Sequence, residues 1–260
     1  MTSRMIAGGL LTGILIAVPA TAQRSPVAVP ANLPPGVMAL ACAPYAALSV
    51  PEMPLRVTGG QAAIVRQNYA PGDLITINAG SQNGIEVGQE FYTRQLQILH
   101  KRAVSADTPA TVRTTGWLRV YAVDDEMSLA TVTHACGEIA VGDYLEPFVL
   151  PTLPVISTDR TKPERDNYGR VLTGSDNRRV FGRGDHFLLD RGADYGITPG
   201  AQFVLYRDKQ VDGNFLYDLG EAVAVSVAEN TATLQVTVSR DAIMAGDYVA
   251  IRPPREDGAN

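Results

Sequence analysis

The sequence has few of the side chains that bind metals or act as nucleophiles, with only three histidines and two cysteines in 260 residues. Of the histidines, His134 lies two positions before Cys136. Residues two apart on a strand share a face, but a metal site needs one or two further ligands, which His100 or an acidic residue could supply only through the fold. The chain also lacks a Gly-x-Ser-x-Gly elbow and a glycine-rich loop followed by Lys-Ser/Thr. We therefore predict that the protein is not an enzyme and has no catalytic, metal-binding or cofactor-binding residues.

Positive charge and long apolar runs are scarce as well. The chain has 22 Lys and Arg residues against 27 Asp and Glu residues, and its formal net charge is −5. Without a basic stripe there is no electrostatic footprint for nucleic acid, so we expect no nucleic-acid partner. After residue 18 no apolar run reaches the roughly 20 residues that cross a bilayer, so the sequence predicts no integral membrane span in the mature chain.

The first residues have the pattern of a secretory signal peptide. Met1–Arg4 carry positive charge, Ile6–Val18 are mostly apolar, and Ala20–Ala22 form an A-x-A cleavage site. We predict cleavage after Ala22 and a secreted or periplasmic location. An uncleaved anchor is the alternative, but the apolar run is short for it. A lipoprotein is another, although Ala39–Cys42 is a poor lipobox.

The two cysteines, Cys42 and Cys136, would lie in an oxidising compartment, where two thiols of a secreted protein most often pair. One free and one buried thiol is the alternative. We predict a disulfide, which would fasten residues 23–54 to the following domain and contribute roughly 3–5 kcal/mol. This segment is rich in Pro and Ala without periodicity, so we expect an extended N-terminal arm that is ordered near Cys42 and Tyr45.

The rest of the chain is duplicated. Gly72–Gly80 (GDLITINAG) recurs 112 residues later as Gly184–Gly192 (GDHFLLDRG), and Ile139–Tyr144 (IAVGDY) recurs 104 residues later as Ile243–Tyr248 (IMAGDY). Two copies of one folding unit that differ in one connection explain both offsets. The sequence therefore predicts these parts: a signal peptide 1–22, the arm 23–54, repeat one 55–148, a Pro-rich linker 149–167, repeat two 168–254 and a polar tail 255–260.

Within the repeats the apolar residues alternate with a period of two, which is typical of strands. Leu118, Val120 and Ala122, for example, alternate with Arg119 and Tyr121. Short strands bounded by Gly and Asp suggest a small barrel or sandwich. We predict an all-β fold of two tandem homologous small barrels, SH3-like or open. The expected strands are 56–66, 73–78, 89–96, 115–123, 128–134 and 144–148 in repeat one, and 170–181, 185–190, 201–207, 219–227, 230–238 and 248–252 in repeat two.

The repeated glycines and aspartates are predicted to be structural. Glycines at every fourth position commonly have positive φ or a close backbone neighbour. The aspartates of the Gly-Asp pairs are expected to bond turn amides rather than to act as paired catalytic carboxylates. The predicted turn residues are Gly80, Gly84, Gly88, Gly192, Gly196, Gly200, Asp143 and Asp247.

These motifs resemble small β domains of secreted bacterial envelope proteins. The likeness lies in Asn78–Gly80 and Thr115–Leu118 of repeat one, and in Phe203–Arg207, Leu219–Glu221, Ala232–Thr233 and Ile243–Asp247 of repeat two. The C-terminal domain of FlgT-type flagellar basal-body proteins and the β units of LysM-type envelope proteins are similar, and the barrels of the rod-shape protein MreC are more distantly so. The resemblance implies envelope binding or assembly and transfers no catalytic residue.

The sequence therefore favours a non-catalytic envelope binding or assembly scaffold, whose partner is an envelope protein or a cell-wall glycan. A glycan-binding or peptidoglycan-binding protein is the alternative, which a groove lined by Tyr92, Tyr121 or Tyr206 would favour. Trp117 is expected to pack in a core, against the arm, or to make an exposed contact. The connection around residues 93–114 is the candidate partner-contact loop, with the cationic side chains and histidine Arg94, His100, Lys101, Arg102 and Arg113.

Overall fold

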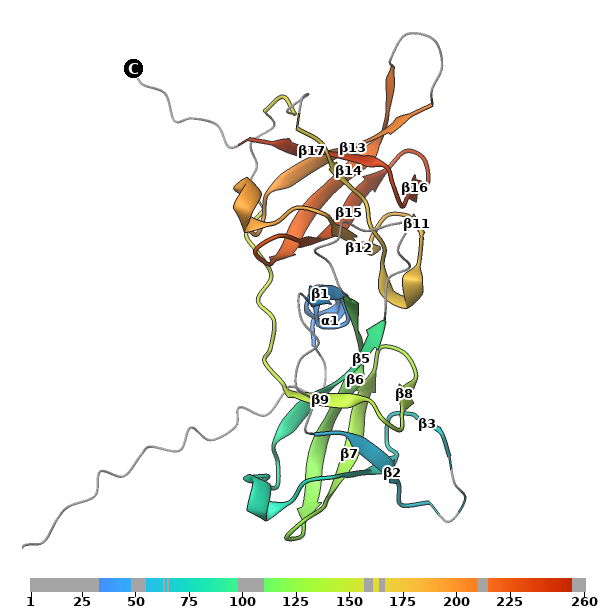
Figure 1. Ribbon diagram of the computed structural model, residues 1–260, viewed down its shortest axis with the longest axis vertical. Coiled ribbons are helices and arrows are strands. Elements are labelled where there is room, and N and C mark those ends of the chain that lie inside the picture. The colour runs from blue at the N-terminus through green and yellow to red at the C-terminus, as the bar shows by residue number, and fades with distance from the viewer. Residues whose placement is uncertain are drawn as a thin grey trace, which may run out of the picture.

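The fold is all-β, with the strands gathered into two units stacked along the long axis (Figure 1). The computed structural model describes residues 33–47, 55–62, 64, 66–97, 110–156, 161–163, 167–209 and 215–253. The predicted signal peptide, the tail and the loop residues His100, Lys101 and Arg102 lie outside these described residues. A short arm, residues 33–47, lies between the two units (Figure 1).

The first unit is one curled sheet with the strand order β2-β4-β7-β6-β5-β9, and the short strands β3 and β8 pair separately. An isolated bridge between Arg56 and Tyr144 joins the start of β2 to β9, so the two ends of the strand order meet. Its elements are β2 (Val57–Gly60), β3 (Asn68–Tyr69), β4 (Leu74–Ile77), η1 (Ser81–Asn83), β5 (Glu90–Gln97), β6 (Ala110–Val123), β7 (Ser128–Ala135), β8 (Ile139–Ala140) and β9 (Tyr144–Pro147).

The second unit repeats this arrangement. Its sheet has the order β10-β17-β13-β14-β15-β12, and a bridge between Val171 and Leu189 links the β10 end to β12. Read around the circle, matching strands have the same neighbours in both units. The elements are β10 (Gly169–Arg170), η2 (Ser175–Asn177), β11 (Val180–Phe181), β12 (His186–Leu189), η3 (Ala193–Tyr195), β13 (Gln202–Asp208), β14 (Leu216–Val227), β15 (Ala232–Ser239), β16 (Ile243–Met244) and β17 (Tyr248–Arg252).

The strands differ from the expected ranges in two places. Of the expected strand 56–66, Val57–Gly60 form β2, and the separate strand β3 begins beyond that range at Asn68. The expected strand 170–181 is interrupted between β10 and β11. The hairpin strands are longer than expected, because β6 begins at Ala110 and β14 at Leu216. The described parts of the connection around residues 93–114, which are 93–97 and 110–114, therefore belong to the sheet, and Arg94 and Arg113 are strand residues.

Alternation along the strands produces two separate cores. On β6, Leu118 and Val120 point inward and are buried, whereas Tyr121 is exposed. The first core gathers around Ile75, Ile77 and Leu118. The second contains the phenylalanines Phe181, Phe187 and Phe203 with Leu189 of β12 and Leu205 of β13. Each unit therefore has a hydrophobic core of its own. Burial of each Ile, Leu or Phe side chain stabilises the folded state by about 1.5–3 kcal/mol.

Four Gly-Asp pairs close four equivalent turns. Their glycines have φ between 89° and 97°, the left-handed region that favours glycine, and occupy the third turn position as in type II turns. In each turn the aspartate N–H donates to the carbonyl three residues earlier, and the aspartate carboxylate accepts the N–H of that same residue. The pairs are Asp73 with Ala70, Asp143 with Ala140, Asp185 with Gly182, and Asp247 with Met244.

The glycine triads serve two different needs. Gly84 and Gly88, like Gly196 and Gly200, have positive φ. Gly80 and Gly192 have extended backbones instead, and a Cβ on either would lie 2.2 to 2.3 Å from a carbonyl oxygen of the neighbouring turn, that of Asp124 or Ala228. Each triad therefore fixes its turn against the β6–β7 or β14–β15 connection.

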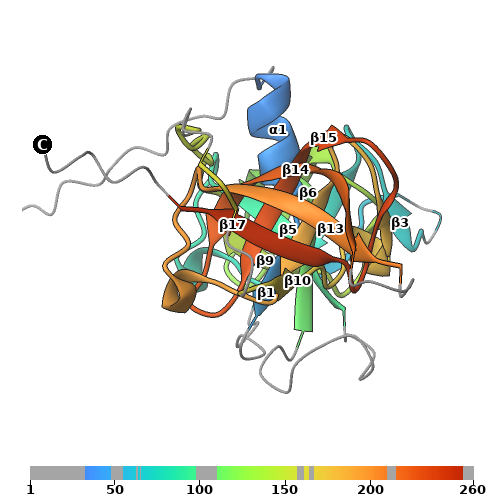
Figure 2. The ribbon, with the colours of Figure 1, turned by 90° about the horizontal axis from the view of Figure 1, so that it is seen from above.

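The arm is not extended throughout. Residues Pro35–Ala41 form helix α1, and Tyr45–Ala47 form strand β1, which pairs antiparallel with Ala110–Val112 of β6. Pro35 opens the helix, where its missing N–H and fixed φ are tolerated. A seven-residue helix is marginal alone, so packing holds it. The helix projects at one side of the stacked units when they are viewed from above (Figure 2).

Candidate interface cleft between the two units

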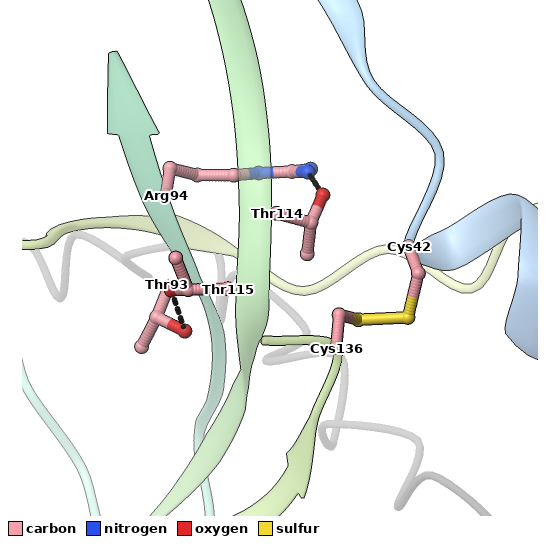
Figure 3. Close-up of a disulfide and its surroundings, with 6 residues drawn as sticks. All are labelled: Cys42, Thr93, Arg94, Thr114, Thr115 and Cys136. Atoms are coloured by element: carbon pink, nitrogen blue, oxygen red, sulfur yellow. Dashed lines mark hydrogen bonds between the residues drawn. A yellow bond between two sulfur atoms is a disulfide. The ribbon is translucent and has the colours of Figure 1, made fainter. Parts of the chain in front are cut away.

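The arm is covalently attached to the first unit. Cys42 and Cys136 form a disulfide with a Cα–Cα distance of 5.6 Å, which confirms the predicted pairing (Figure 3). Cys42 is the C-terminal cap of α1, and Cys136 directly follows β7. Cys42, His134 and Cys136 place possible ligand atoms within 4.8 Å of one another, but the two sulfurs are bonded to each other, so neither is a thiolate that could bind a metal.

A small apolar cluster seats α1 on the first unit. Its buried members are Leu33, Ala41, Tyr92 and Trp117, and Val37, Met38, Cys42, Cys136 and Phe148 pack against them. Trp117 stacks on His134 at 4.2 Å between ring centroids. Of the three expectations for Trp117, packing against the arm is therefore what the structure shows, and desolvation in this cluster lowers the pKa of His134.

Arg94 extends from β5 across the neighbouring strand instead of pointing into solvent (Figure 3). Its Nε donates to Glu146 at 3.2 Å, and its Nη1 donates to the Thr114 hydroxyl. The guanidinium lies over the rings of Tyr45 and Tyr92, 5.1 Å and 4.0 Å from their centroids. Glu146 balances the charge of Arg94, Thr114 accepts its hydrogen bond, and two tyrosine rings pack against it. Arg94 is therefore a packing residue of the region where the arm meets the first unit, which we call the junction.

The tyrosines of this junction are neutral hydrogen-bond donors. Tyr45 donates its hydroxyl to Glu146 at 2.9 Å, and Tyr92 donates to the Val149 carbonyl at 2.9 Å. Burial raises the pKa of Tyr45, Tyr92 and Tyr144, and the nearby Arg94 only partly offsets it. They therefore keep their protons at physiological pH and cannot serve as bases there.

A cleft of about 440 Å³ opens where the arm meets both units. The arm supplies Pro44 and Tyr45, the first unit supplies Arg94 and Glu146, and the second unit supplies Ser226 and Thr233. Across it, the buried Thr233 hydroxyl donates to the Pro44 carbonyl at 2.8 Å. The arm thus contacts the second unit directly while it is covalently bound to the first.

A second contact between the units lies at the other side of the junction. Arg113 of β6 forms an ion pair with Asp176 of η2 at 2.5 Å, and the Gln97 amide donates to the same carboxylate at 3.4 Å. Arg113 therefore faces the second unit. Whether residues of the 93–114 connection contact a partner remains a prediction.

The three tyrosines proposed as a glycan groove lie apart. Tyr92 lines the cleft but is buried, Tyr121 is exposed on the outside of β6, and Tyr206 of β13 packs edge-to-face on Tyr168. Glu146 and Ser226 were not among the site residues predicted from the sequence. The sequence contained one signal for Glu146. The cross-strand pair Tyr92 and Glu146 aligns with Val204 and Ala250 of the other repeat, and this change from apolar to polar residues marks a difference in surroundings.

The buried aspartates Asp143 and Asp247 differ in their partners. Asp143 accepts the Thr115 hydroxyl proton at 2.8 Å, and desolvation raises the pKa of its carboxyl group. Asp247 forms a bidentate ion pair with Arg207 at 2.7 and 2.8 Å, which raises the pKa of the arginine. Both groups are used to hold turns against the sheet.

Within the described part of the chain, no helix is long and apolar enough to cross a membrane. Scans of the sequence against protein-family models and against curated proteins found no match.

Proposed function

We propose that this chain is an exported, non-catalytic binding or assembly module of the bacterial cell envelope, built from two tandem homologous β-barrels of SH3-like or open type. The matching strand order of the two units, with a bridge between the ends of each order, supports the barrel description. The repeated turns support their homology.

The arm is the observation that supports this proposal most directly. It is bonded to the first unit through Cys42–Cys136 and hydrogen-bonded to the second through Pro44 and Thr233. Two similar units held by such a connector present one preorganised surface, which lowers the entropic cost of binding a large partner. At the junction, Tyr45, Tyr92, Arg94 and Thr233 are engaged in packing and hydrogen bonds, which suits a scaffold.

Export and binding can be tested with the protein itself. The chain is expressed with its own leader in a bacterium with a periplasm, and N-terminal sequencing of the periplasmic protein should start at Gln23. The mature, oxidised protein is then immobilised and exposed to envelope proteins and, separately, to purified sacculi. Saturable binding of a defined envelope protein supports the proposal, whereas an uncleaved cytoplasmic product or no envelope ligand at all would refute it.

Glycan binding is the second candidate, and the cleft is the observation that favours it. A concave site with tyrosines beside an Arg and a Glu suits the apolar faces and hydroxyl groups of a sugar. Co-sedimentation with sacculi that is lost in Glu146→Gln but kept in Tyr195→Ala, an exposed tyrosine of η3, would replace the protein-scaffold proposal with this one. Equal sedimentation of both variants would place any glycan site outside the cleft.

A further inference from the structure

The two units point the same way along the long axis. We call the end of a unit with the β5–β6 or β13–β14 hairpin its upper face, and the end with the β6–β7 or β14–β15 turn its lower face. The upper face of the first unit, with the arm on it, meets the lower face of the second (Figure 1). The upper face of the second unit and the lower face of the first lie at opposite ends of the molecule, and within the described part of the chain neither meets the other unit (Figure 1).

Strand register identifies equivalent positions on the two upper faces. Both hairpins have an irregularity at the same place, after Thr93 and after Leu205. Beyond it, Gln95 pairs with Arg113 in the first unit, as Arg207 pairs with Tyr217 in the second. Tyr217 therefore occupies the position of Arg113, and two residues earlier Phe215 occupies that of Thr111.

These equivalent residues differ sharply in exposure. On the first unit, Thr111 is 0% exposed under β1, and the Arg113 side chain is 15% exposed against η2. On the second unit, Phe215 is 68% and Tyr217 42% exposed. Among the described residues no strand pairs with Leu216 on the side opposite β13, where its counterpart Val112 pairs with Tyr45 of β1. The second upper face thus exposes aromatic side chains and a strand edge where the first face is covered.

The two lower faces show the same contrast. Val225 of the second unit lines the junction cleft and is 9% exposed. The register of β6 on β7 and of β14 on β15 places Tyr121 at the equivalent position in the first unit, and Tyr121 is 66% exposed. Beside it the turn contains exposed Met127 and the acidic residues Asp124–Glu126, whereas the opposite free face has Lys209 over the Tyr217 ring. The lower face of the first unit therefore combines apolar surface with acidic side chains. The upper face of the second unit combines aromatic side chains with Lys209 and with the aspartates Asp208 and Asp218, of which Asp218 pairs with Arg240.

We propose that the upper face of the second unit binds the lower face of the first unit in another copy of this chain, so that copies associate head to tail. The contact is the same kind of upper-to-lower junction that each chain already forms internally, with Phe215 and Tyr217 in place of the arm. Such a contact joins two different surfaces, so it does not close a dimer and can continue from copy to copy. This inference rests on the proposed assembly function and adds a further partner, another copy of the chain.

Sedimentation velocity of the pure, oxidised mature protein over a wide concentration range tests the proposal. The weight-average mass should rise beyond that of a dimer without reaching a plateau, and less so at high salt, because Lys209 and the acidic turn attract each other. Tyr217→Ser removes an anchor from the upper face, and Tyr121→Ser removes one from the lower face. Each variant alone should lose most of the association, since aromatic residues dominate interface energies.

Mixing the two variants gives the sharpest result. Tyr217→Ser keeps an intact lower face and Tyr121→Ser keeps an intact upper face, so an equimolar mixture should form heterodimers and stop there. Tyr195→Ser, the exposed tyrosine of η3, is the matched control and should associate like the wild type. Circular dichroism should be used to check that all variants are folded.

Three outcomes would overturn the inference: a monomer at every concentration, association that neither substitution weakens, or variants that are not rescued by mixing, which would indicate a symmetric contact. None of them depends on an envelope ligand. A monomer that binds an envelope component would overturn this inference alone, whereas a self-associating chain without an envelope ligand would overturn only the proposed function.

Discussion

At the scale of single residues, the repeats reuse one turn but surround it differently. The four Gly-Asp turns have the same backbone hydrogen bonds, yet Asp143 and Asp247 are buried whereas Asp73 and Asp185 are partly exposed. The sequence therefore predicts the turn, because glycine and aspartate satisfy its local requirements. The sequence does not show which of the four aspartates is also buried against the sheet.

Asp247→Asn should be far more destabilising than Asp73→Asn. Asparagine keeps an oxygen that can accept the turn N–H, so both changes remove mainly charge. In the first case the bidentate ion pair with Arg207 is broken at a largely buried site, at a cost of about 3 kcal/mol. The pair of Asp73 with Arg66 is solvent-exposed and should cost less than about 1 kcal/mol. Urea unfolding measures both, and equal losses would show that the Arg207 pair adds nothing.

His186 should make the protein less stable below neutral pH. Burial lowers its pKa from 6.5 to about 4, partly offset by Asp185. Between these values the unfolded chain binds the proton and the folded chain does not, so the stabilisation is complete above about pH 6.5 and is lost as the pH falls toward 4. The free energy of unfolding should fall by about 3 kcal/mol in total as His186 becomes protonated. Unfolding free energies of the wild type and His186→Gln across this range should differ in slope, and parallel curves would contradict the prediction.

At the scale of elements, the arm departs most from the sequence-based expectation. Its Pro and Ala content indicates an extended chain, but α1 forms because the first unit offers an apolar surface around Trp117 and Tyr92. The disulfide was predictable from the number of cysteines and the expected compartment. The helix was not, since a seven-residue segment is set by its packing surface rather than by its own propensity.

Removing the disulfide should lower stability and loosen the arm. Its cysteines are 94 residues apart, and a loop of that length corresponds to about 4.7 kcal/mol of lost unfolded-chain entropy. A Cys42→Ser, Cys136→Ser double variant should unfold at lower urea concentration, and Trp117, the only tryptophan, should emit at longer wavelength as α1 leaves it. A reductant should shift the wild type in the same way and leave the double variant unchanged. An unaltered midpoint would mean that packing alone fixes the arm.

At the scale of the whole molecule, the described residues couple the units through the Thr233–Pro44 hydrogen bond and through the contacts of Asp176 with Arg113 and Gln97. Thr233→Val removes the hydroxyl that reaches Pro44 and leaves that carbonyl unsatisfied, at a cost of about 1–3 kcal/mol. Trp117 reports on the first unit, and circular dichroism reports on both. We expect the two signals to coincide during unfolding of the wild type and to separate in Thr233→Val. Thr237→Val, which breaks a bond to Glu221 inside the second unit, is the control and should keep them together.

The sequence by itself determined the period-two strands, the duplicated turns and the pairing of two cysteines, because these depend on local backbone preference, alternation and chemistry. Only the tertiary structure decided that Arg94 packs over the rings of Tyr45 and Tyr92, that Arg113 faces Asp176, and that Phe215 and Tyr121 lie exposed at opposite ends. Two copies of one motif share the same strand alternation and the same turn conformations. What each surface contacts depends on how the copies stack around the arm, and that arrangement is set by long-range packing.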